Sequence, residues 1–366
     1  MTFEAPEENV PLAPLTTLGV GGAARWLARV SYGRDVARAY EWAAARRAPV
    51  FVLGGGSNLV VADQGFPGLV LRMHGGGIAT PIRRGDDMLI KAGAGFSWDA
   101  LVTFAVERGL AGVECLSGIP GTVGGTPIQN VGAYGQEVAS VIECVEAFDV
   151  QQQRHVVLSA ADCEFDYRMS RFKARDAGRF VVCGVMFRFR PGPPAIRYPE
   201  LADYLAQKKK EPDLADVRAA VLAIRARKGM VLDDADPDTR SVGSFFMNPV
   251  VSHATFERIA TSASGRADTP GPRVPHFMMD NDSVKIPAAW LIERSGFSRG
   301  HVDGCAGVST KHPLAIINRG GATARDVIRL ARRIKEAVND WFGIALRPEP
   351  VFVGFDDDPD VRYLRG

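Results

Sequence analysis

The sequence predicts an α+β protein with two or three domains, in which bare backbone loops contact the ligand. The chain has 366 residues, which is enough for more than one hydrophobic core. Stretches with helical spacing of apolar residues alternate with β-branched or alternating stretches. The run at 118–135 holds six glycines and two prolines in eighteen residues, and only Tyr134 in it carries a large side chain. Such a run cannot build a core, but its main-chain N–H groups can approach a flat, polyanionic ligand.

The first predicted elements are a helix, a strand, a glycine turn and a further strand. Residues 34–47 have the composition of a helix that ends at Ala48-Pro49, and 50–53 is an apolar strand. The turn GGGSN at 54–58 follows this strand and leads into LVVAD, not into a helix. A Rossmann turn opens a helix, so the dinucleotide fingerprint lacks its context here. We expect the further strand at 68–71.

The middle of the chain is predicted to form an antiparallel α+β layer. Residues 88–92 have the pattern of a strand, after which Ser97 caps a helix that runs to Arg108 and closes at Gly109. Alternating or β-branched residues predict three more strands, at 141–150, 155–158 and 180–190.

The C-terminal part follows a stretch rich in proline and charge at 191–212, which predicts a domain boundary. Helices are expected at 213–228, after Pro287, and after a capping box formed by Thr323 and Asp326. Residues 264–283 are polar and irregular, and we expect the acidic tail after Phe355 to fray. The apolar positions of the last long helix keep helical spacing: Val327, Leu330, Ala331, Ile334, Val338 and Trp341.

Composition and charge argue against several classes of protein. A formal net charge of +2 gives no general attraction to nucleic acid or to a membrane surface. The N-terminus lacks the apolar region of a signal peptide, and no apolar run approaches the roughly 20 residues that span a bilayer. The six histidines are scattered, so we expect no metal site. The five cysteines form no CxxC pair, which favours reduced thiols in the cytoplasm. They are Cys115, Cys144, Cys163, Cys183 and Cys305.

The two glycine-rich loops are the candidate cofactor site. Backbone donors in GGGSN and the hydroxyl of Ser57 suit phosphate oxygens, although an isolated GGG is more often a plain hairpin turn. The run at 118–135 carries no charge, which argues against disorder, and a loop this long in a compact domain is usually functional. Together the two loops predict a cofactor that contains a pyrophosphate.

Three polar residues in distinctive surroundings are candidates for chemistry. Arg168, in FDYRMSRFK, could hold a carboxylate or stabilise enolate charge; alternatively it is a surface arginine in a solvated turn. Ser244, in VGSFFMNPV, could donate a proton in a site that the phenylalanines keep dry; alternatively it is a buried, hydrogen-bonded serine. Glu349, between two prolines in RPEPVFVG, could act in acid–base chemistry or simply face a turn.

Taken together and in this order, these segments resemble the UDP-N-acetylenolpyruvoylglucosamine reductases, also called UDP-N-acetylmuramate dehydrogenases. The resemblance covers residues from about 10 to 355 and is carried by PLTTLGVGG, LGGGSN, GIPGTVGGTPIQNVGAYG, YRMSRFK, VGSFFMNPVV, KIPAAWLIERSGF and RPE. It implies a two-lobed FAD-binding domain of the vanillyl-alcohol-oxidase/PCMH type, followed by an α+β substrate-binding domain. The implied boundaries are 1–75 and 76–205 for the two lobes, 206–355 for the substrate domain and 356–366 for an acidic tail.

The resemblance also implies a reaction and a set of residues. In this family NADPH gives a hydride to FAD, flavin N5 passes it to C3 of the enolpyruvyl ether, and C2 is protonated. Ser244 would be the proton donor, while Arg168 and Glu349 would stabilise the enolate. FAD would contact Gly54, Gly55, Gly56, Ser57, Asn58, Pro120, Gly121, Gly124, Gly125, Ile128 and Gly132. The nucleotide sugar would contact Tyr134, Tyr167, Tyr198, Lys228 and Asn248, with Tyr198 in a lid loop, IRYPEL.

Some positions depart from the family pattern, and Arg227 is an alternative to Lys228. Met247 stands where a lysine is common, Pro350 where a β-branched residue is usual, and His312 where a polar substrate contact is expected. Two other functions compete with the reductase: another FAD-dependent oxidase or dehydrogenase, and a non-catalytic flavin or nucleotide module. The module would be expected to lose Arg168, Ser244 or Glu349. We expect a cytoplasmic monomer that binds no nucleic acid and does not span a membrane.

Overall fold

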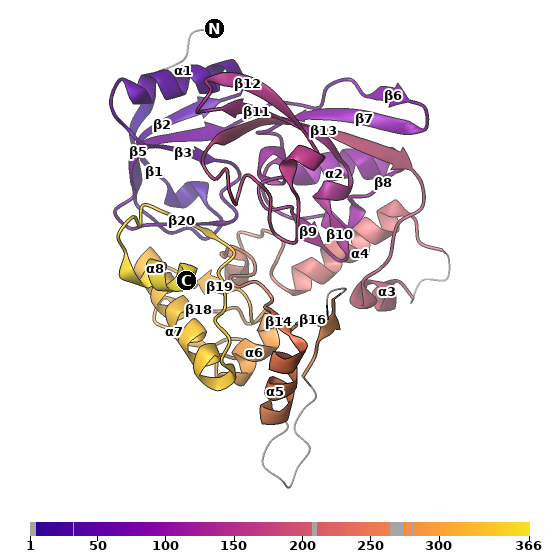
Figure 1. The fold of residues 1–366 in the computed structure, drawn as a ribbon, viewed down its shortest axis with the longest axis vertical. Coiled ribbons are helices and arrows are strands. Elements are labelled where there is room, and N and C mark those ends of the chain that lie inside the picture. Colours follow the sequence, from indigo (N-terminus) through magenta and orange to yellow (C-terminus); the bar gives the residue numbers. More distant parts are fainter. Residues whose placement is uncertain (1–4, 32, 207–210, 264–273, 280–281) are drawn as a thin grey trace. The chain divides into compact units, whose positions relative to one another are not determined.

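The computed structural model describes residues 5–31, 33–206, 211–263, 274–279 and 282–366 (Figure 1). The chain forms two compact units, and each is built from separated pieces of sequence. Unit 1 comprises Met1–Pro11, Ala23–Gly56 and Phe66–Val231, and unit 2 comprises Leu12–Gly22, Ser57–Gly65 and Leu232–Gly366. Unit 2 therefore takes two short pieces from the N-terminal part of the chain.

The first layer of unit 1 is a mixed sheet with the strand order β1-β2-β5-β3. Strands β2 and β3 run parallel to β5, and β1 is antiparallel to β2. Helix α1 contributes the buried residues Val36, Ala39 and Ala43 to the core of this unit. The elements are β1 (Glu7–Pro11), β2 (Ala23–Val30), α1 (Gly33–Ala44), β3 (Val50–Leu53) and β5 (Phe66–Met73). The helix expected at 34–47 thus ends three residues earlier than predicted.

The second layer of unit 1 is the antiparallel sheet that the alternating stretches predicted. Its order is β12-β11-β13-β7-β6, and β8 pairs with the far end of β13. Helix α2 begins at the predicted cap, where the Ser97 side chain accepts a hydrogen bond from Ala100 N. The elements are β6 (Ile82–Arg84), β7 (Asp87–Gly93), α2 (Trp98–Glu107), β8 (Leu110–Ala111), β11 (Ile142–Asp149), β12 (Arg154–Ser159) and β13 (Phe180–Pro191).

Two further helices of unit 1 pack on a small apolar cluster near the glycine-rich run. Helix α3 (Pro199–Leu205) and helix α4 (Leu214–Arg227) bury Leu201, Val217 and Ile224 together with Cys115. This packing explains why unit 1 continues to Val231, although the predicted substrate domain begins at 206.

Unit 2 joins short strands to a long amphipathic helix. Helix α7 (Ala324–Phe342) starts at the predicted capping box of Thr323 and Asp326 and ends at Gly343, which has the left-handed φ of 67°. Its buried stripe includes Val327, Leu330, Ala331, Ile334 and Val338. The other elements are β4 (Leu59–Val61), β14 (Val250–Ser252), α5 (His253–Ala263), β15 (Phe277–Met278), β16 (Ser283–Lys285), α6 (Ala288–Arg294), β17 (Val302–Asp303), β18 (Ala306–Val308), β19 (Ile316–Asn318) and β20 (Val351–Val353).

Trp341 keeps the helical spacing of α7 but is 68% exposed, whereas its neighbour Phe342 packs against the core of unit 2. One expectation about the C-terminal region was wrong. The tail after Phe355 does not fray completely: α8 (Pro359–Arg365) buries Val361 and Leu364, and the buried Lys335 ammonium donates to the carbonyl oxygens of Tyr363 and Leu364. The irregular stretch expected at 264–283 lies partly outside the described residues; its described part includes β15 and the start of β16.

An acidic side chain from the N-terminal part of the chain completes the start of α7. The Asp63 carboxylate accepts hydrogen bonds from Ala324 N at 2.7 Å and Arg325 N at 3.1 Å. These are N–H groups of the first turn, which have no partner inside a helix and which carry the positive end of its dipole. Asp63 therefore fixes the insertion Ser57–Gly65 onto the rest of unit 2.

We predict that Asp63→Ala lowers the free energy of unfolding by about 1 kcal/mol, the usual effect of removing a helix cap. Asp86→Ala is the matched control, because Asp86 lies exposed in the turn between β6 and β7. Urea unfolding of both variants measures the difference. Equal midpoints for the two variants would show that the Asp63 contacts do not stabilise the protein.

Candidate active site

The two glycine-rich loops meet in unit 1 at a point where the first loop has no room for a side chain and the second has a backbone conformation that favours glycine. The first loop follows β3, and the second is the run at 118–135. A Cβ atom built on Gly55 would lie 2.5 Å from Gly121 Cα, and one built on Gly54 would lie 2.9 Å from Thr122 Oγ1. Gly121 also has a φ of 133°, which side-chain-bearing residues rarely adopt. The contact confirms that the two loops are neighbours in space.

The second loop is fixed by backbone hydrogen bonds to residues 94–98. Val123 N donates to Phe96 O, Gly124 N to Ala94 O, and Trp98 N to Gly121 O, at 2.9, 2.9 and 3.1 Å. Gly125 N donates to Thr122 O. The N–H groups of Gly124 and Gly125 are thus already donated within the protein. These two glycines can therefore contribute to ligand binding by allowing close approach to the backbone more than by donating hydrogen bonds from their N–H groups.

Where the loops touch, a buried hydroxyl is left without a partner. Thr122 Oγ1 is buried and has no hydrogen-bond partner in the described structure. An orphaned hydroxyl beside a strip without Cβ atoms suits a phosphate group, so the residues present fit a pyrophosphate cofactor. Thr122 was not among the residues predicted to bind the cofactor, although a hydroxyl residue directly after Gly121 could have indicated it.

Arg168 lies against the end of the glycine-rich run. Its Nη2 donates to Gly132 O at 2.5 Å, and it has a left-handed φ of 54°. Nonglycine residues hold this conformation at a cost, and such strain clusters at functional sites. The turn that carries Arg168 is fixed by Asn130, whose Nδ2 donates to Asp166 O. The ring centroid of Tyr167 is 5.2 Å from the Arg168 guanidinium.

Three of the expected substrate residues gather at one place in unit 1. The rings of Tyr134 and Tyr198 pack edge to face with centroids 5.4 Å apart, and Lys228 Nζ is 5.9 Å from the Tyr134 ring. Burial raises the pKa of the Tyr134 hydroxyl to about 12, so this residue stays neutral. Lys228, at the C-cap of α4, also forms an ion pair of 2.5 Å with Glu200. Glu200 was missed, although it stands two residues after Tyr198.

In unit 2, short backbone pairing brings Ser244 and Glu349 to the same place. Glu349 N donates to Phe245 O at 2.9 Å, and Met247 N donates to Arg347 O at 3.0 Å. Phe245 and Phe246 are almost completely buried, whereas Ser244 is half-buried. The sequence could not show this pairing, because about a hundred residues separate the two segments.

The predicted amide residues of unit 2 have defined partners. Asn58 Nδ2 donates to Glu349 O at 3.3 Å, and Val351 N donates to Asn58 O at 3.0 Å. Strand β4 then continues parallel to β20. Asn248 Oδ1 accepts a hydrogen bond from Ala288 N at 2.9 Å, at the start of α6. The structure therefore joins Ser244, Glu349 and Asn58 in one unit, while Arg168 belongs to the other.

Comparisons with known proteins find relatives that cover nearly the whole chain. The family model for the C-terminal domain of UDP-N-acetylenolpyruvoylglucosamine reductase matches residues 236–353, and the model for an FAD binding domain matches 26–154. The chain is 48% identical over 362 residues to the UDP-N-acetylenolpyruvoylglucosamine reductase of Thermobifida fusca, covering 94% of this chain and 97% of the relative. The chain belongs to the UDP-N-acetylenolpyruvoylglucosamine reductase family.

Two further similarities support this reductase family. The UDP-N-acetylenolpyruvoylglucosamine reductase of Mycobacterium tuberculosis (strain ATCC 25618 / H37Rv) is 46% identical over 359 residues, with 95% of both chains covered. The crystal structure of the reductase from Thermus caldophilus is 28% identical, with a TM-score of 0.62 and coverage of 96% of this chain and all of that one. The resemblance seen in the motifs and the predicted α+β fold with an FAD-binding domain are confirmed.

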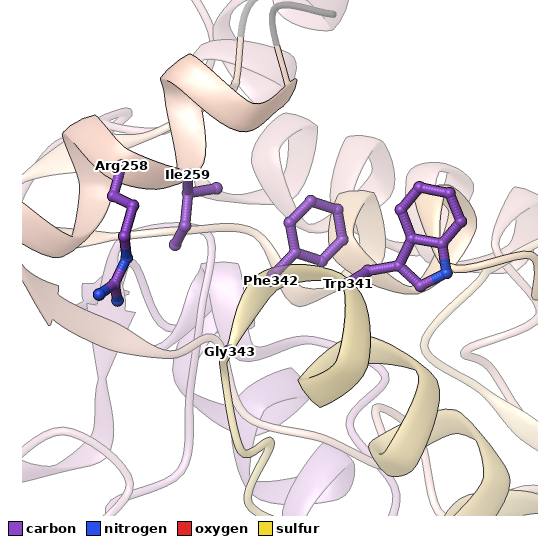
Figure 2. Close-up of a pocket in the computed structure, with 5 residues that line it drawn as sticks. All are labelled: Arg258, Ile259, Trp341, Phe342 and Gly343. Atoms are coloured by element: carbon purple, nitrogen blue, oxygen red, sulfur yellow. The ribbon is translucent and has the colours of Figure 1, made fainter.

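Features outside the predicted positions are less informative for the reductase reaction. A cavity of about 460 Å³ in unit 2 lies between α5 and the end of α7 and contains none of the predicted residues (Figure 2). Its lining residues are Arg258, Ile259, Trp341, Phe342 and Gly343.

No group of three or more His, Cys, Asp or Glu side chains within the described ranges could hold a metal ion. None of the helices that the structure describes is long and apolar enough to cross a membrane.

The contact between the glycine loops gives a direct prediction. Gly55→Ala would place a methyl group within 2.5 Å of Gly121 Cα, so one of the two backbones must move. Gly77→Ala is the control, because a Cβ there meets nothing within 4 Å and neither glycine has a positive φ. We expect purified Gly55→Ala to keep its circular dichroism spectrum but lose most of its bound flavin absorbance. Full flavin content in Gly55→Ala would contradict the assignment of this contact to the cofactor site.

Proposed function

We propose that this protein uses NADPH to reduce the enolpyruvyl ether of UDP-N-acetylglucosamine enolpyruvate, giving UDP-N-acetylmuramate for peptidoglycan synthesis. The observation that carries the proposal is the backbone pairing of residues 245–247 with 347–349, which brings the segment that carries the half-buried Ser244 next to the segment that carries Glu349. The family membership supports the same reaction.

Bound FAD would supply a two-electron carrier that takes a hydride from NADPH and returns it to the substrate. Gly54, Gly55 and Gly121 allow a ligand to approach bare backbone, and Thr122 adds a hydroxyl for a phosphate oxygen. The remaining proposed flavin contacts are Gly56, Ser57, Asn58, Pro120, Gly124, Gly125, Ile128 and Gly132. Their role in binding is part of the proposal.

The catalytic assignment follows from where charge develops. Hydride addition at C3 of the enolpyruvyl group leaves an electron pair on C2, which the neighbouring carboxylate delocalises until C2 takes a proton. We assign proton donation to the Ser244 hydroxyl and stabilisation of the enolate to Arg168 and Glu349. The buried rings of Phe245 and Phe246 would limit water next to Ser244. The left-handed backbone at Arg168 would aim its guanidinium in a fixed direction.

The nucleotide-sugar part of the substrate needs cations and flat apolar surfaces. Tyr134 and Tyr198 offer ring faces and neutral hydroxyls, and Lys228 supplies a positive charge beside them. We assign the diphosphate to Lys228 and Asn248, and a further contact to Tyr167. The close packing of Tyr134, Tyr198 and Lys228 supports Lys228 over its neighbour Arg227.

We further propose that the reaction takes place in the cytoplasm and that one chain carries the whole catalytic machinery. The five cysteines are all free thiols in the structure, which fits a reducing compartment. Gel filtration of the flavin-loaded protein tests whether it is a monomer in solution.

The proposed reaction is tested by mixing flavin-loaded protein with NADPH and UDP-N-acetylglucosamine enolpyruvate. We expect NADPH absorbance to fall in proportion to the substrate added, with one UDP-N-acetylmuramate formed for each NADPH consumed. Slow NADPH oxidation at a rate that does not depend on the added substrate would contradict the proposal and favour another flavin oxidase or dehydrogenase.

The role of Ser244 is tested by separating the two half-reactions in a stopped-flow instrument. Ser244→Ala should leave flavin reduction by NADPH nearly unchanged. It should slow flavin reoxidation by the substrate by roughly a hundredfold or more, as expected when a general acid is removed. Ser298→Ala, at an exposed serine of the same unit, is the control. Equal losses in both half-reactions would mean that Ser244 is structural.

A further inference from the structure

A buried carboxylate lies directly ahead of the glycine-rich run and takes no part in the chemistry proposed above. Glu114, in the short 3-10 helix Glu114–Leu116, is completely buried. Its Oε2 accepts from Gly112 N at 2.7 Å, and its Oε1 accepts from Gln136 Nε2 at 2.7 Å and from Ala195 N at 3.3 Å. All three donors are neutral, so the described contacts satisfy the carboxylate without an ion pair.

These hydrogen bonds join three separate pieces of unit 1. Gln136 belongs to β10 (Gln136–Glu137), which pairs with β9 (Gly132–Ala133) as a short hairpin. Its side chain is bonded at both ends, because Gln136 Oε1 also accepts from Cys115 N at 2.9 Å. Ala195 lies in the segment that leads to Tyr198 and α3. Glu114 therefore holds the hairpin and this segment against the residues that precede the glycine-rich run.

The two pieces that Glu114 holds carry the two tyrosines of the proposed substrate site. Tyr134 stands at the tip of the β9–β10 hairpin with a left-handed φ of 49°, and Tyr198 caps α3. Their rings pack edge to face with centroids 5.4 Å apart. The pieces also touch beside Tyr134, where a Cβ on Gly135 would lie 3.2 Å from Arg197 Cβ. Small shifts of either piece would therefore separate the rings.

A buried carboxylate such as Glu114 is suited to holding neighbouring segments in one position. Burying an ionised carboxylate is costly unless several donors meet it, and hydrogen bonds to a charged acceptor are about twice as strong as neutral ones. Burial, with a further contribution from the nearby Glu114 charge, raises the pKa of the Cys115 thiol to about 12. Breaking one of these bonds would leave a buried charge less satisfied, which favours a single arrangement of the three pieces.

We propose that Glu114 is a positioning residue that sets the Tyr134–Tyr198 pair for the nucleotide sugar. It acts through Gln136 on the hairpin and through Ala195 N on the Tyr198 segment. This inference rests on the proposed function, because it names what orders the substrate-binding residues of that reaction. The hydrogen bonds of Glu114 reach the two segments that carry the tyrosines and not the contact between Gly55 and Gly121, so its loss should affect substrate use and spare flavin reduction.

The first test is Glu114→Gln, which keeps the shape of the side chain but replaces an acceptor oxygen with a donor. The new amide must face a donor N–H, so at least one of the three bonds is lost. We expect KM for UDP-N-acetylglucosamine enolpyruvate to rise roughly tenfold, the effect of losing a hydrogen bond to a charged group. Flavin reduction by NADPH should stay within about twofold of the wild-type rate.

The matched control for this change is Glu143→Gln. Glu143 forms partly exposed ion pairs with Arg84 and Arg188 on the antiparallel sheet of the same unit. Such pairs contribute little, so this variant should keep the wild-type KM.

The second variant, Ala195→Pro, removes the N–H that links Glu114 to the Tyr198 segment and also restricts the local backbone. It leaves the buried carboxylate with Gly112 and Gln136, and it lies in a partly exposed stretch that already contains Pro193 and Pro194. It therefore tests the anchor even if Glu114→Gln does not fold. We expect a selective rise in KM, smaller than for Glu114→Gln, with wild-type flavin content and flavin reduction.

The outcomes separate this inference from the proposed function. If wild-type protein shows no substrate-dependent NADPH oxidation, the proposed function fails. If wild type is active but both folded variants keep the wild-type KM, or lose flavin reduction as much as substrate use, Glu114 is not a positioning residue. The positioning role of Glu114 is supported if KM for the nucleotide sugar rises while flavin reduction by NADPH keeps its wild-type rate, in Ala195→Pro alone or in both variants.

Discussion

The close approach of Gly55 to Gly121 is the constraint on which the cofactor site of unit 1 depends. With 2.5 Å between a Gly55 Cβ and Gly121 Cα, only glycine allows this contact. The second loop is held at this distance by its hydrogen bonds to residues 94–98. It is held again at its start, where the Asp99 carboxylate accepts from Gly118 N at 2.6 Å and from both terminal nitrogens of Arg218 at 2.7 Å. The glycine-rich run has a composition that would allow many backbone conformations, but these hydrogen bonds hold it in one.

The same fixed run connects the proposed cofactor contacts to the substrate residues of unit 1. Asp99 and Arg218 link α2 to α4, and Lys228 is the C-cap residue of α4. Glu114 links the residues before the run to the hairpin that ends it. Burial acts to raise the pKa of Asp99, but the bonds from Arg218 and Gly118 outweigh it and lower that pKa, so the carboxylate stays charged at neutral pH. Charged and amide side chains outside the run therefore order a segment in which six of eighteen residues are glycine.

Much of the fold could be predicted from local sequence, whereas contacts distant in the chain could not. The cap at Ser97, the capping box at Thr323 and the strand that ends in GGGSN depend on neighbouring residues and were found. The exposure of Trp341, the helix in the tail and the cap that Asp63 gives to α7 depend on packing partners elsewhere. Helical spacing marks a face of a helix but does not say where the core stops.

The residues of the candidate site likewise fall into those that sequence motifs revealed and those that only the structure revealed. The loops and the motifs around Arg168, Ser244 and Glu349 were visible in the sequence, and the resemblance gave them roles. Thr122, Glu200 and Glu114 were missed because an isolated hydroxyl or carboxylate has no signature. Their importance comes from burial and partners, which only the structure supplies.

Hydrogen exchange measured with and without FAD tests the central claim most directly, namely that both glycine loops belong to one cofactor site. The protein would be stripped of flavin, reloaded with one equivalent of FAD, and followed at peptides that cover 54–56 and 118–125. We predict that FAD slows exchange in both peptides together. Slower exchange in only one loop, or in neither, would contradict it.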